Sequence, residues 1–187
     1  QSVIDEYPSE ACEINFGNIF IWRNFERSKF TLLNDNLCIL CEPPSEPAYF
    51  LQPIGDCKIK ETIEICLSFV HRLSRLPESF VARYCTEYRC EPDRNNFDYV
   101  YLSKDLINLK GKKYDGKRNR IKRFERNHTS KYIRLSREHL EDCRHLFEEW
   151  HKSKSPSNTQ LSPQKDAILE SLAYFEALSL VGGAVEV

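Results

Sequence analysis

The order of apolar and polar positions along the chain predicts short strands interleaved with amphipathic helices. In five segments apolar side chains recur at helical spacing, and Pro77 ends one of those segments. Short apolar runs bounded by Gly, Pro, Asn and Asp mark the strands. The predicted helices are 9–25, 60–76, 112–127, one capped by Ser136 and one that begins at Ser162 and Pro163; the predicted strands are 30–33, 37–41, 48–52, 79–85, 98–102, 132–135 and 179–187.

These elements favour the α+β fold class. The first two strands form a predicted hairpin around Asn34, Asp35 and Asn36, which are residues typical of a tight turn. No strict strand–helix–strand repeat follows the hairpin. An α+β fold is therefore expected rather than a doubly wound parallel sheet.

A break in the pattern near residues 127–130, followed by the polar stretch 152–160, divides the chain into predicted domains 1–130 and 131–187. The first domain would be a mixed sheet made of the hairpin and the strands near 48, 80 and 98, with the second predicted helix packed on it. The second domain would begin near Tyr132, with Phe147 and Trp150 in its core.

The composition excludes several classes of protein. Hydrophobic residues make up 41%, charged residues 29% and aromatic residues 12% of the 187 residues, values that do not suit a disordered chain. No uncharged apolar run approaches the roughly 18 residues that a membrane helix needs. The first residues have none of the features of a signal peptide. A cytoplasmic protein is therefore expected, and its oligomeric state is left open.

The eight cysteines are expected to be reduced and mostly buried. Cys38 and Cys41 have the CxxC spacing of a metal site, but the chain has no second CxxC and no suitably paired His. Both residues also lie in a predicted strand. Because a free thiol behaves as a small apolar group, we expect neither a disulfide nor a bound metal.

Positive charge is concentrated in one predicted helix. The net charge of the chain is −1, but residues 110–126 contain nine basic and two acidic residues. Basic side chains three or four positions apart on a helix repel one another, so an anion would stabilise this segment. The other interpretation is a solvated, charge-rich helix face. The predicted anion-binding residues are Lys112, Lys113, Lys117, Arg118, Arg120 and Arg123.

Arg118 and Arg123 are the residues of this set that could form forked contacts with phosphate. The same helix carries an apolar stripe of Tyr114, Ile121 and Phe124. Ile121 and Phe124 are expected to face the core, and the basic side chains, including Lys122, are expected to be exposed.

No pattern of acid–base or nucleophilic catalysis is present in the sequence. Residues 111–118 approach a Walker A loop, but Arg118 stands where that loop needs the Ser or Thr that binds magnesium. The five histidines are scattered, and neither HExxH nor GxSxG occurs. The catalytic residues therefore stay unassigned.

Three stretches of the chain together resemble a known family. They are residues 18–22, residues 49–56 and the run from Asp98 through the basic helix, which includes Lys-Gly-Lys-Lys-Tyr at 110–114 and Lys-Arg-Asn at 117–119. In these stretches the chain resembles an uncharacterised bacterial family that is similar to the C-terminal domain of phosphatidylglycerol lysyltransferases. The resemblance spans nearly the whole chain, and the basic run is its most specific part.

The resemblance implies two tandem GNAT-like (acyl-CoA N-acyltransferase-like) domains, which are mixed sheets with flanking helices, the second incomplete in this chain. It also implies a relation to Fem-type peptidoglycan aminoacyltransferases, and hence an acyl- or aminoacyltransferase with an anionic donor or acceptor. The implied partners are aminoacyl-tRNA, CoA or an anionic lipid headgroup. The alternative function is a non-catalytic RNA- or polyanion-binding module that uses the same basic helix.

The resemblance also implies where CoA would bind. In GNAT folds the acyl-CoA pyrophosphate binds main-chain amides at a helix N-terminus. The corresponding turn, residues 52–57, lacks spaced glycines and contains Pro53, which has no N–H, and Asp56, which would repel the pyrophosphate. The first domain is therefore expected not to bind CoA. In the second domain the equivalent turn would follow Val187, so this chain alone is expected to be inactive, with acyl-CoA or aminoacyl-tRNA as candidates for the complete protein.

Overall fold

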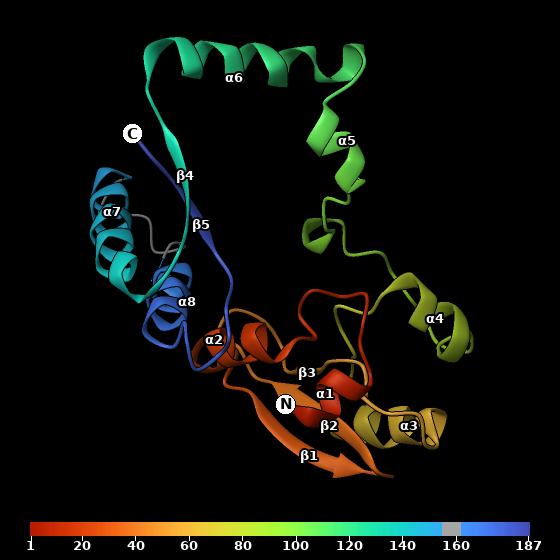
Figure 1. The fold of residues 1–187 in the computed structure, drawn as a ribbon. Helices are drawn as coiled ribbons and strands as arrows, with labels where there is room; N and C mark the ends of the chain where they lie inside the picture. The colour runs from red at the N-terminus through yellow and green to blue at the C-terminus, as the bar shows by residue number, and fades with distance from the viewer. Residues whose placement is uncertain (155–161) are drawn as a thin grey trace. The chain divides into compact units, whose positions relative to one another are not determined.

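A computed structural model describes residues 1–154 and 162–187 (Figure 1). The chain forms two compact units that are interleaved in sequence: residues 1–93 with 141–180, and residues 94–140 with 181–187. Each unit contains helices and one small antiparallel sheet, which confirms the α+β class. The tandem GNAT-like arrangement and the domain boundary at residue 130 stay predictions.

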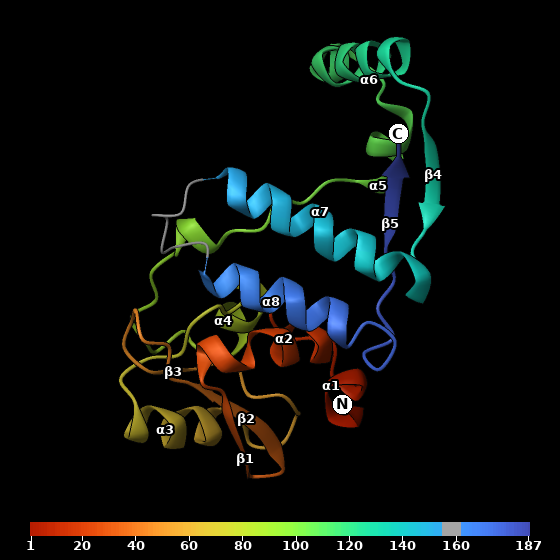
Figure 2. The same cartoon turned by 90° about the vertical axis from the view of Figure 1, so that its left-hand side faces the viewer.

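The first unit combines helices with a three-stranded sheet in the order β1-β2-β3. Helices α2 and α8, from opposite ends of the sequence, pack against each other and lie side by side in Figure 2. The elements of this unit are α1 (Ser2–Glu6), α2 (Phe16–Glu26), β1 (Lys29–Leu33), β2 (Asn36–Cys41), β3 (Tyr49–Phe50), α3 (Ile59–Phe69), α4 (Glu78–Tyr84), α7 (Leu140–Ser153, apart from its first residue) and α8 (Ser162–Ala173).

The predicted hairpin is confirmed as β1 and β2. Leu33 pairs with Asn36 at its end, and Asn34 and Asp35 between them have φ values of 49° and 64°. A tight two-residue hairpin turn requires such left-handed values, which Asn and Asp tolerate better than most residues. Since β3 pairs with the other edge of β2, the mostly buried β2 is the central strand of the sheet.

The core of the first unit lies around β2, β3 and the helices beside them. Helix α3 packs against β2, as predicted for the second helix. The buried core residues form three clusters: Ile4, Ile14, Ile39, Cys41, Tyr49, Leu51 and Ile54; Ile59, Ile63, Phe80 and Cys85; and Cys38, Phe50 and Cys66.

The helix predicted over 60–76 is shorter than expected, because α3 ends at Phe69. Beyond it the chain runs beside β3. The Phe50 N–H donates to the Arg72 carbonyl oxygen at 3.2 Å, and the Ser74 N–H donates to the Phe50 carbonyl oxygen at 3.0 Å. Hydrogen bonding to the sheet therefore replaces the last turns of the predicted helix.

Two predicted strands are wrong. Residues 79–84 lie in α4, which follows Pro77 and places the rings of Phe80 and Tyr84 one turn apart, with centroids 5.1 Å from each other. Residues 98–102 belong to neither of the two sheets found in the described residues. The mixed sheet expected for the first domain is therefore a three-stranded antiparallel sheet without strands near 80 and 98.

The second unit is built around a two-stranded antiparallel sheet, which confirms the strands predicted over 132–135 and at the end of the chain. Tyr132 pairs with Val185 across this sheet. The elements of this unit are the 3₁₀ turn η1 (Arg94–Asn96), α5 (Ser103–Asn108), η2 (Lys112–Tyr114), α6 (Asp115–Asn127), β4 (Lys131–Arg134), η3 (Arg137–His139) and β5 (Gly183–Glu186).

The segment around α7 confirms one prediction and contradicts another. Ser136 caps the helical segment that leads into α7, as expected, through a capping box with His139. Phe147 and Trp150, expected in the core of the second domain, instead lie on α7 in the first unit, and Trp150 is exposed. That prediction is wrong, because α7 makes its contacts in the first unit. Most of the predicted linker 152–160 lies outside the described residues.

Four cysteines are buried: Cys38 and Cys41 on β2, Cys66 on α3, and Cys85 after α4. Burial raises the pKa of the Cys41 and Cys85 thiols. The reduced state of all eight cysteines stays a prediction. Within 1–154 and 162–187, no helix has both the length and the apolar character needed to cross a membrane.

Candidate polyanion interface

The basic helix α6 is preceded by a tight turn that Arg118 holds in place. Leu109 and Gly111 have positive φ values of 47° and 90°, and glycine adopts such values without strain. The Arg118 guanidinium donates to the carbonyl oxygens of both residues, at 3.0 Å for Gly111, and pairs with Asp115. Arg118 therefore connects the turn to the first turn of α6.

The short helix η2 is connected to α5 through one carboxylate. Lys113 Nζ lies 3.1 Å from Asp105 Oδ2, and the Tyr114 hydroxyl donates to the same oxygen at 3.4 Å. The hydrogen bond that Lys113 donates to Asp105 is the main cause that raises the pKa of Lys113. Tyr114 is the one buried residue among the described residues of the second unit. Tyr114 thus packs beneath the turn, and Lys113 already has a protein partner.

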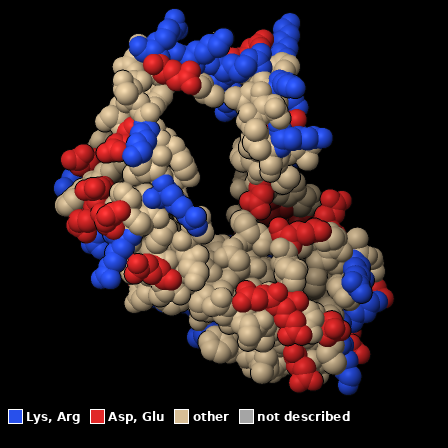
Figure 3. All heavy atoms as spheres, in the orientation of Figure 1, with Lys and Arg blue, Asp and Glu red and all other residues tan. Residues whose placement is uncertain are grey.

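Helix α6 has two chemically different faces. At 3.6 residues per turn, Ile121 and Phe124 fall on one side of the helix, whereas Lys122, Arg123 and Arg126 fall on the opposite side. We call these three residues the cationic face. An open hollow in the surface is lined by Asn119, Lys122, Glu125 and Arg126. Figure 3 shows Lys and Arg side chains gathered over α6.

The residues predicted to bind anions fall into two groups. Lys113 and Arg118 have the local partners described above. Lys112, Lys117, Arg120 and Arg123 are exposed, and none of them has an ion pair within the part of the chain that the structure describes. Lys117 lies on the same side of α6 as Ile121, away from the cationic face.

Arg118 does not join α6 to the acidic remainder of the chain. Its acidic partner, Asp115, belongs to the same basic segment. Within the described residues, neither Arg118 nor Arg123 forms an ion pair with an acidic residue outside the basic segment.

The expectation that Ile121 and Phe124 face the core is wrong. Their exposed fractions are 45% and 38%, and Phe124 stacks on the His128 ring with centroids 4.8 Å apart. The reason is that η2 leads directly into α6 in the chain, and no other described element packs extensively against the helix to cover this apolar stripe.

The sequence prediction missed Lys122 and Arg126 as parts of this site. Both are exposed, and the Arg126 Nε donates to the Lys122 carbonyl oxygen at 3.3 Å, one turn earlier. The spacing of residues 122, 123 and 126 would have placed them on one face, because positions three and four apart are neighbours on a helix.

The cationic face concentrates like charges at short range. Lys122 and Arg126 are separated by about 6 Å along the helix axis, which is shorter than the Debye length of about 8 Å at physiological ionic strength. Arg126 gains some stabilisation from its place in the last turn, near the negative end of the helix dipole. The remaining repulsion would be relieved by a bound polyanion.

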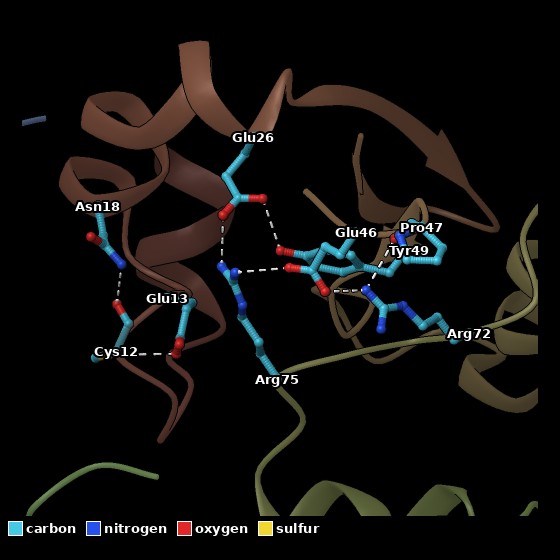
Figure 4. A network of polar contacts seen from close by, with 9 residues as sticks. All are labelled: Cys12, Glu13, Asn18, Glu26, Glu46, Pro47, Tyr49, Arg72 and Arg75. Carbon is cyan, nitrogen blue, oxygen red and sulfur yellow. Dashed lines mark hydrogen bonds and ion pairs between the residues drawn. The ribbon is translucent and has the colours of Figure 1, made fainter. Parts of the chain in front are cut away.

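A second charged cluster lies in the first unit (Figure 4). Glu26, at the end of α2, is only 5% exposed, and both of its carboxylate oxygens have partners. Oε1 lies 3.0 Å from Arg75 Nη1, and Oε2 accepts a hydrogen bond from the Tyr49 hydroxyl at 2.9 Å. Arg75 has a φ of 59°, a left-handed value that is uncommon for arginine.

The rim of this cluster is also paired. Glu46 forms an ion pair with Arg72, and Glu46 Oε1 lies 3.8 Å from Arg75 Nη2. The guanidinium groups of Arg72 and Arg75 both lie over the Tyr49 ring. Burial is the main cause that raises the pKa of Tyr49, so its hydroxyl stays protonated as a donor. Each charged side chain of the cluster has an ion-pair partner within it, although the buried Arg72 Nε has no hydrogen-bond partner among the described residues. We therefore interpret this cluster as a structural connection between α2, β3 and the segment after α3.

The turn at residues 52–57 does not fit an acyl-CoA pyrophosphate. The fully buried Asn36 side chain fills it: its Oδ1 accepts from the Cys57 N–H at 3.2 Å, and its Nδ2 donates to the Cys57 carbonyl oxygen. Gly55 has a φ of 149°, and a Cβ there would lie 2.3 Å from Asn36 Oδ1. The N–H of Cys57 is thus already used, and Pro53 has none.

Comparison with known proteins adds two findings. A family model described as phosphatidylglycerol lysyltransferase, C-terminal, matches residues 4–187. The chain is also similar to a solved structure described as a conserved protein of unknown function from Bacteroides thetaiotaomicron VPI-5482, with a TM-score of 0.84 and 24% sequence identity, over 100% of this chain and 68% of the other. At that identity the likeness shows a shared fold. A search of curated proteins found no match.

Proposed function

This chain belongs to the phosphatidylglycerol lysyltransferase C-terminal family, and we propose that it acts in aminoacyl transfer, with α6 binding the polyanionic donor, an aminoacyl-tRNA. The observation that carries the proposal is the cationic face: Lys122 and Arg123 are exposed and have no ion pair in the described residues, and Arg126 beside them contacts a main-chain carbonyl. Phosphate groups are the natural partners of such side chains.

The turn at 52–57 favours tRNA over CoA as the donor. An acyl-CoA site of the GNAT type needs free main-chain N–H groups, and Asn36 already occupies the N–H of Cys57. No step through CoA is therefore part of the proposal.

For the acceptor we propose an anionic lipid headgroup such as phosphatidylglycerol, following the name of the family. The ester bond between the aminoacyl group and the tRNA ribose would break as a lipid hydroxyl oxygen attacks the carbonyl carbon. The hydroxyl proton would pass to the ribose oxygen that leaves, so a new ester forms and no oxidant or metal is required. The catalytic residues for this exchange are unassigned.

A non-catalytic RNA-binding module is the second candidate function, because the cationic face alone explains RNA binding without transfer. The two functions differ in turnover. Binding of tRNA without any transfer to lipid would favour the second.

The test is a transfer assay with a panel of aminoacyl-tRNAs, labelled in the amino acid, and vesicles that contain phosphatidylglycerol. We expect label in the lipid fraction with the protein, and a loss of at least about tenfold when Lys122, Arg123 and Arg126 are all changed to Glu. The control variant makes the same change at Lys58, Lys60 and Arg83 of the first unit, so its net charge is identical. Equal loss in both variants would contradict a specific role of α6.

A further inference from the structure

An exposed apolar surface lies just before α6 in the second unit. Tyr99 and Val100 are 90% and 89% exposed in the extended segment before α5, and Ile107 on α5 is 81% exposed. Large contiguous exposed apolar patches mark interaction sites, and these side chains are exposed within nine consecutive residues. We call this the 99–107 surface; its exposed apolar residues are Tyr99, Val100, Tyr101, Leu102, Leu106 and Ile107.

The charged residues within and directly beside the 99–107 surface are Asp98, Lys104 and Asp105. The acidic residue of α5, Asp105, faces η2, where it pairs with Lys113 and accepts a hydrogen bond from Tyr114. Lys104 lies three positions before Ile107, hence on the same side of α5, and it is exposed without an ion pair in the described residues. The outward side of α5 is thus apolar and positive.

This mixture suits a lipid surface better than a protein partner. The centre of a protein–protein interface is depleted of charged residues, particularly lysine. In a membrane interface, by contrast, a lysine stem lies among apolar groups while its ammonium reaches the lipid phosphates, and tyrosine rings favour the headgroup level. Anionic lipids add attraction for each basic residue near the surface.

We propose that the 99–107 surface docks the protein onto an anionic lipid bilayer, with Val100 and Ile107 entering the interface and Lys104 contacting lipid phosphate. The inference rests on the proposed function in one respect, namely that the acceptor is a lipid in a bilayer. Docking at the bilayer surface would give the protein access to such an acceptor.

The experiment is co-sedimentation of the protein with two kinds of vesicle: equal parts of phosphatidylglycerol and phosphatidylcholine, and phosphatidylcholine alone. We expect binding to the first kind and a weakening of at least about tenfold when Val100 and Ile107 are both changed to Ser, since two aliphatic side chains would no longer enter the interface. The matched control changes Phe30 and Leu32, two exposed apolar residues on β1, to Ser. Its binding should equal that of the unchanged protein.

A variant that binds vesicles more tightly tests whether misfolding explains the loss of binding in the double variant. Val100→Trp places a larger interfacial side chain at the same position and should strengthen binding, which a misfolded variant would not do. Unchanged binding in the double variant, or equal loss in the β1 control, would overturn the proposal. So would a dimer in the absence of vesicles that the double variant abolishes, because the occupant would then be a second copy of this chain.

Failure of the docking proposal can be distinguished from failure of the proposed function. If the double variant still binds aminoacyl-tRNA and also binds vesicles normally, docking by the 99–107 surface is refuted, and the proposed role of α6 is unaffected. Loss of tRNA binding in every preparation, with vesicle binding that still depends on Val100 and Ile107, would refute the role of α6 and retain the docking surface.

Discussion

The charged cluster of the first unit pairs its charges with one another, whereas the basic side chains on the cationic face of α6 are exposed to solvent. In the cluster, Glu26 is buried, and each of its oxygens meets a partner, Arg75 or Tyr49. On α6, Lys122 and Arg123 are exposed, lie close to other cations and have no ion pair among the described residues. A buried ion pair is costly to break, whereas an exposed cation is free to bind something else.

The difference between the two regions indicates which charged side chains are candidates for function. The cluster has charges of opposite sign that are paired with one another and an aromatic ring beneath both guanidinium groups, which together stabilise the local fold. The three residues of the cationic face are basic, exposed and mutually repulsive, with Glu125 as the acidic residue that lines the same hollow, and they add little to folding. A site for an external polyanion is expected at the second kind of surface. The predictions below would break or sharpen this contrast.

The largest effect is expected for Glu26→Ala. Removing the carboxylate leaves Arg75 and the Tyr49 hydroxyl in a buried setting without their partner, so the free energy of unfolding should fall by about 3 kcal/mol. Urea denaturation measures it. In the control Glu46→Ala, on the exposed rim of the same cluster, the loss should be about 0.5 kcal/mol. Equal losses in the two variants would mean that burial does not determine how much each ion pair contributes to the free energy of unfolding.

Gly55→Ala should cost about 2 kcal/mol, because the new Cβ collides with the Asn36 side chain and φ at this position is positive. The matched control is Gly116→Ala on α6, where nothing lies within 4 Å of the added Cβ. That change should stabilise the protein by about 0.5 kcal/mol through helix propensity. A neutral Gly55→Ala variant would show that the turn at 52–57 is not filled by Asn36.

Stability should also decline in alkali. Burial raises the pKa of the Cys41 and Cys85 thiols in the folded state, so the unfolded chain loses these protons first, above its thiol pKa of about 8.5. The stabilisation is complete below that pH and is lost as the pH rises toward the folded pKa. We expect a loss of about 1 kcal/mol between about pH 7 and about pH 9.

The measurement is urea denaturation at both pH values. Cys85→Ala should reduce this pH dependence, because it removes one of the two thiols whose pKa is raised by burial. A stability that is constant across this range would contradict the burial of these thiols.

The smallest effect on folding is expected on α6. Changing Lys122 and Arg123 to Glu should alter the free energy of unfolding by less than about 0.5 kcal/mol, because exposed charges contribute little to it. Thermal unfolding monitored by circular dichroism measures the change. A loss as large as that of Glu26→Ala would show that these side chains have a structural partner.

Local patterns in the sequence predicted much of the fold. The hairpin was predictable because Asn34 and Asp35 tolerate left-handed values, and α8 because Ser and Pro together favour a helix start. The aromatic and β-branched residues of 79–85 suggested a strand, although the spacing of Phe80 and Tyr84 also fits a helix. The end of α3 depended on hydrogen bonds to β3 from a distant part of the chain, which no local pattern reveals.

The candidate site was predictable in its location but not in its detail. The concentration of basic residues identified α6, and helical spacing would have added Lys122 and Arg126. The engagement of Arg118 and Lys113 could not be inferred, because it depends on the positive φ of Leu109 and on the position of Asp105. Pairing of Glu26 with Arg75, far apart in sequence, was likewise visible only in the folded chain.

The central claim, that the cationic face binds a polyanionic tRNA, is tested most directly by the salt dependence of aminoacyl-tRNA binding. With three cations on this face, the slope of log affinity against log salt concentration should be about −2 to −3, from about −0.7 to −0.9 for each phosphate contact. The variant in which Lys122, Arg123 and Arg126 are Glu should lose that binding, while the first-unit control with the same net charge keeps it. An affinity that does not depend on salt, or an identical slope in the α6 variant, would contradict the account.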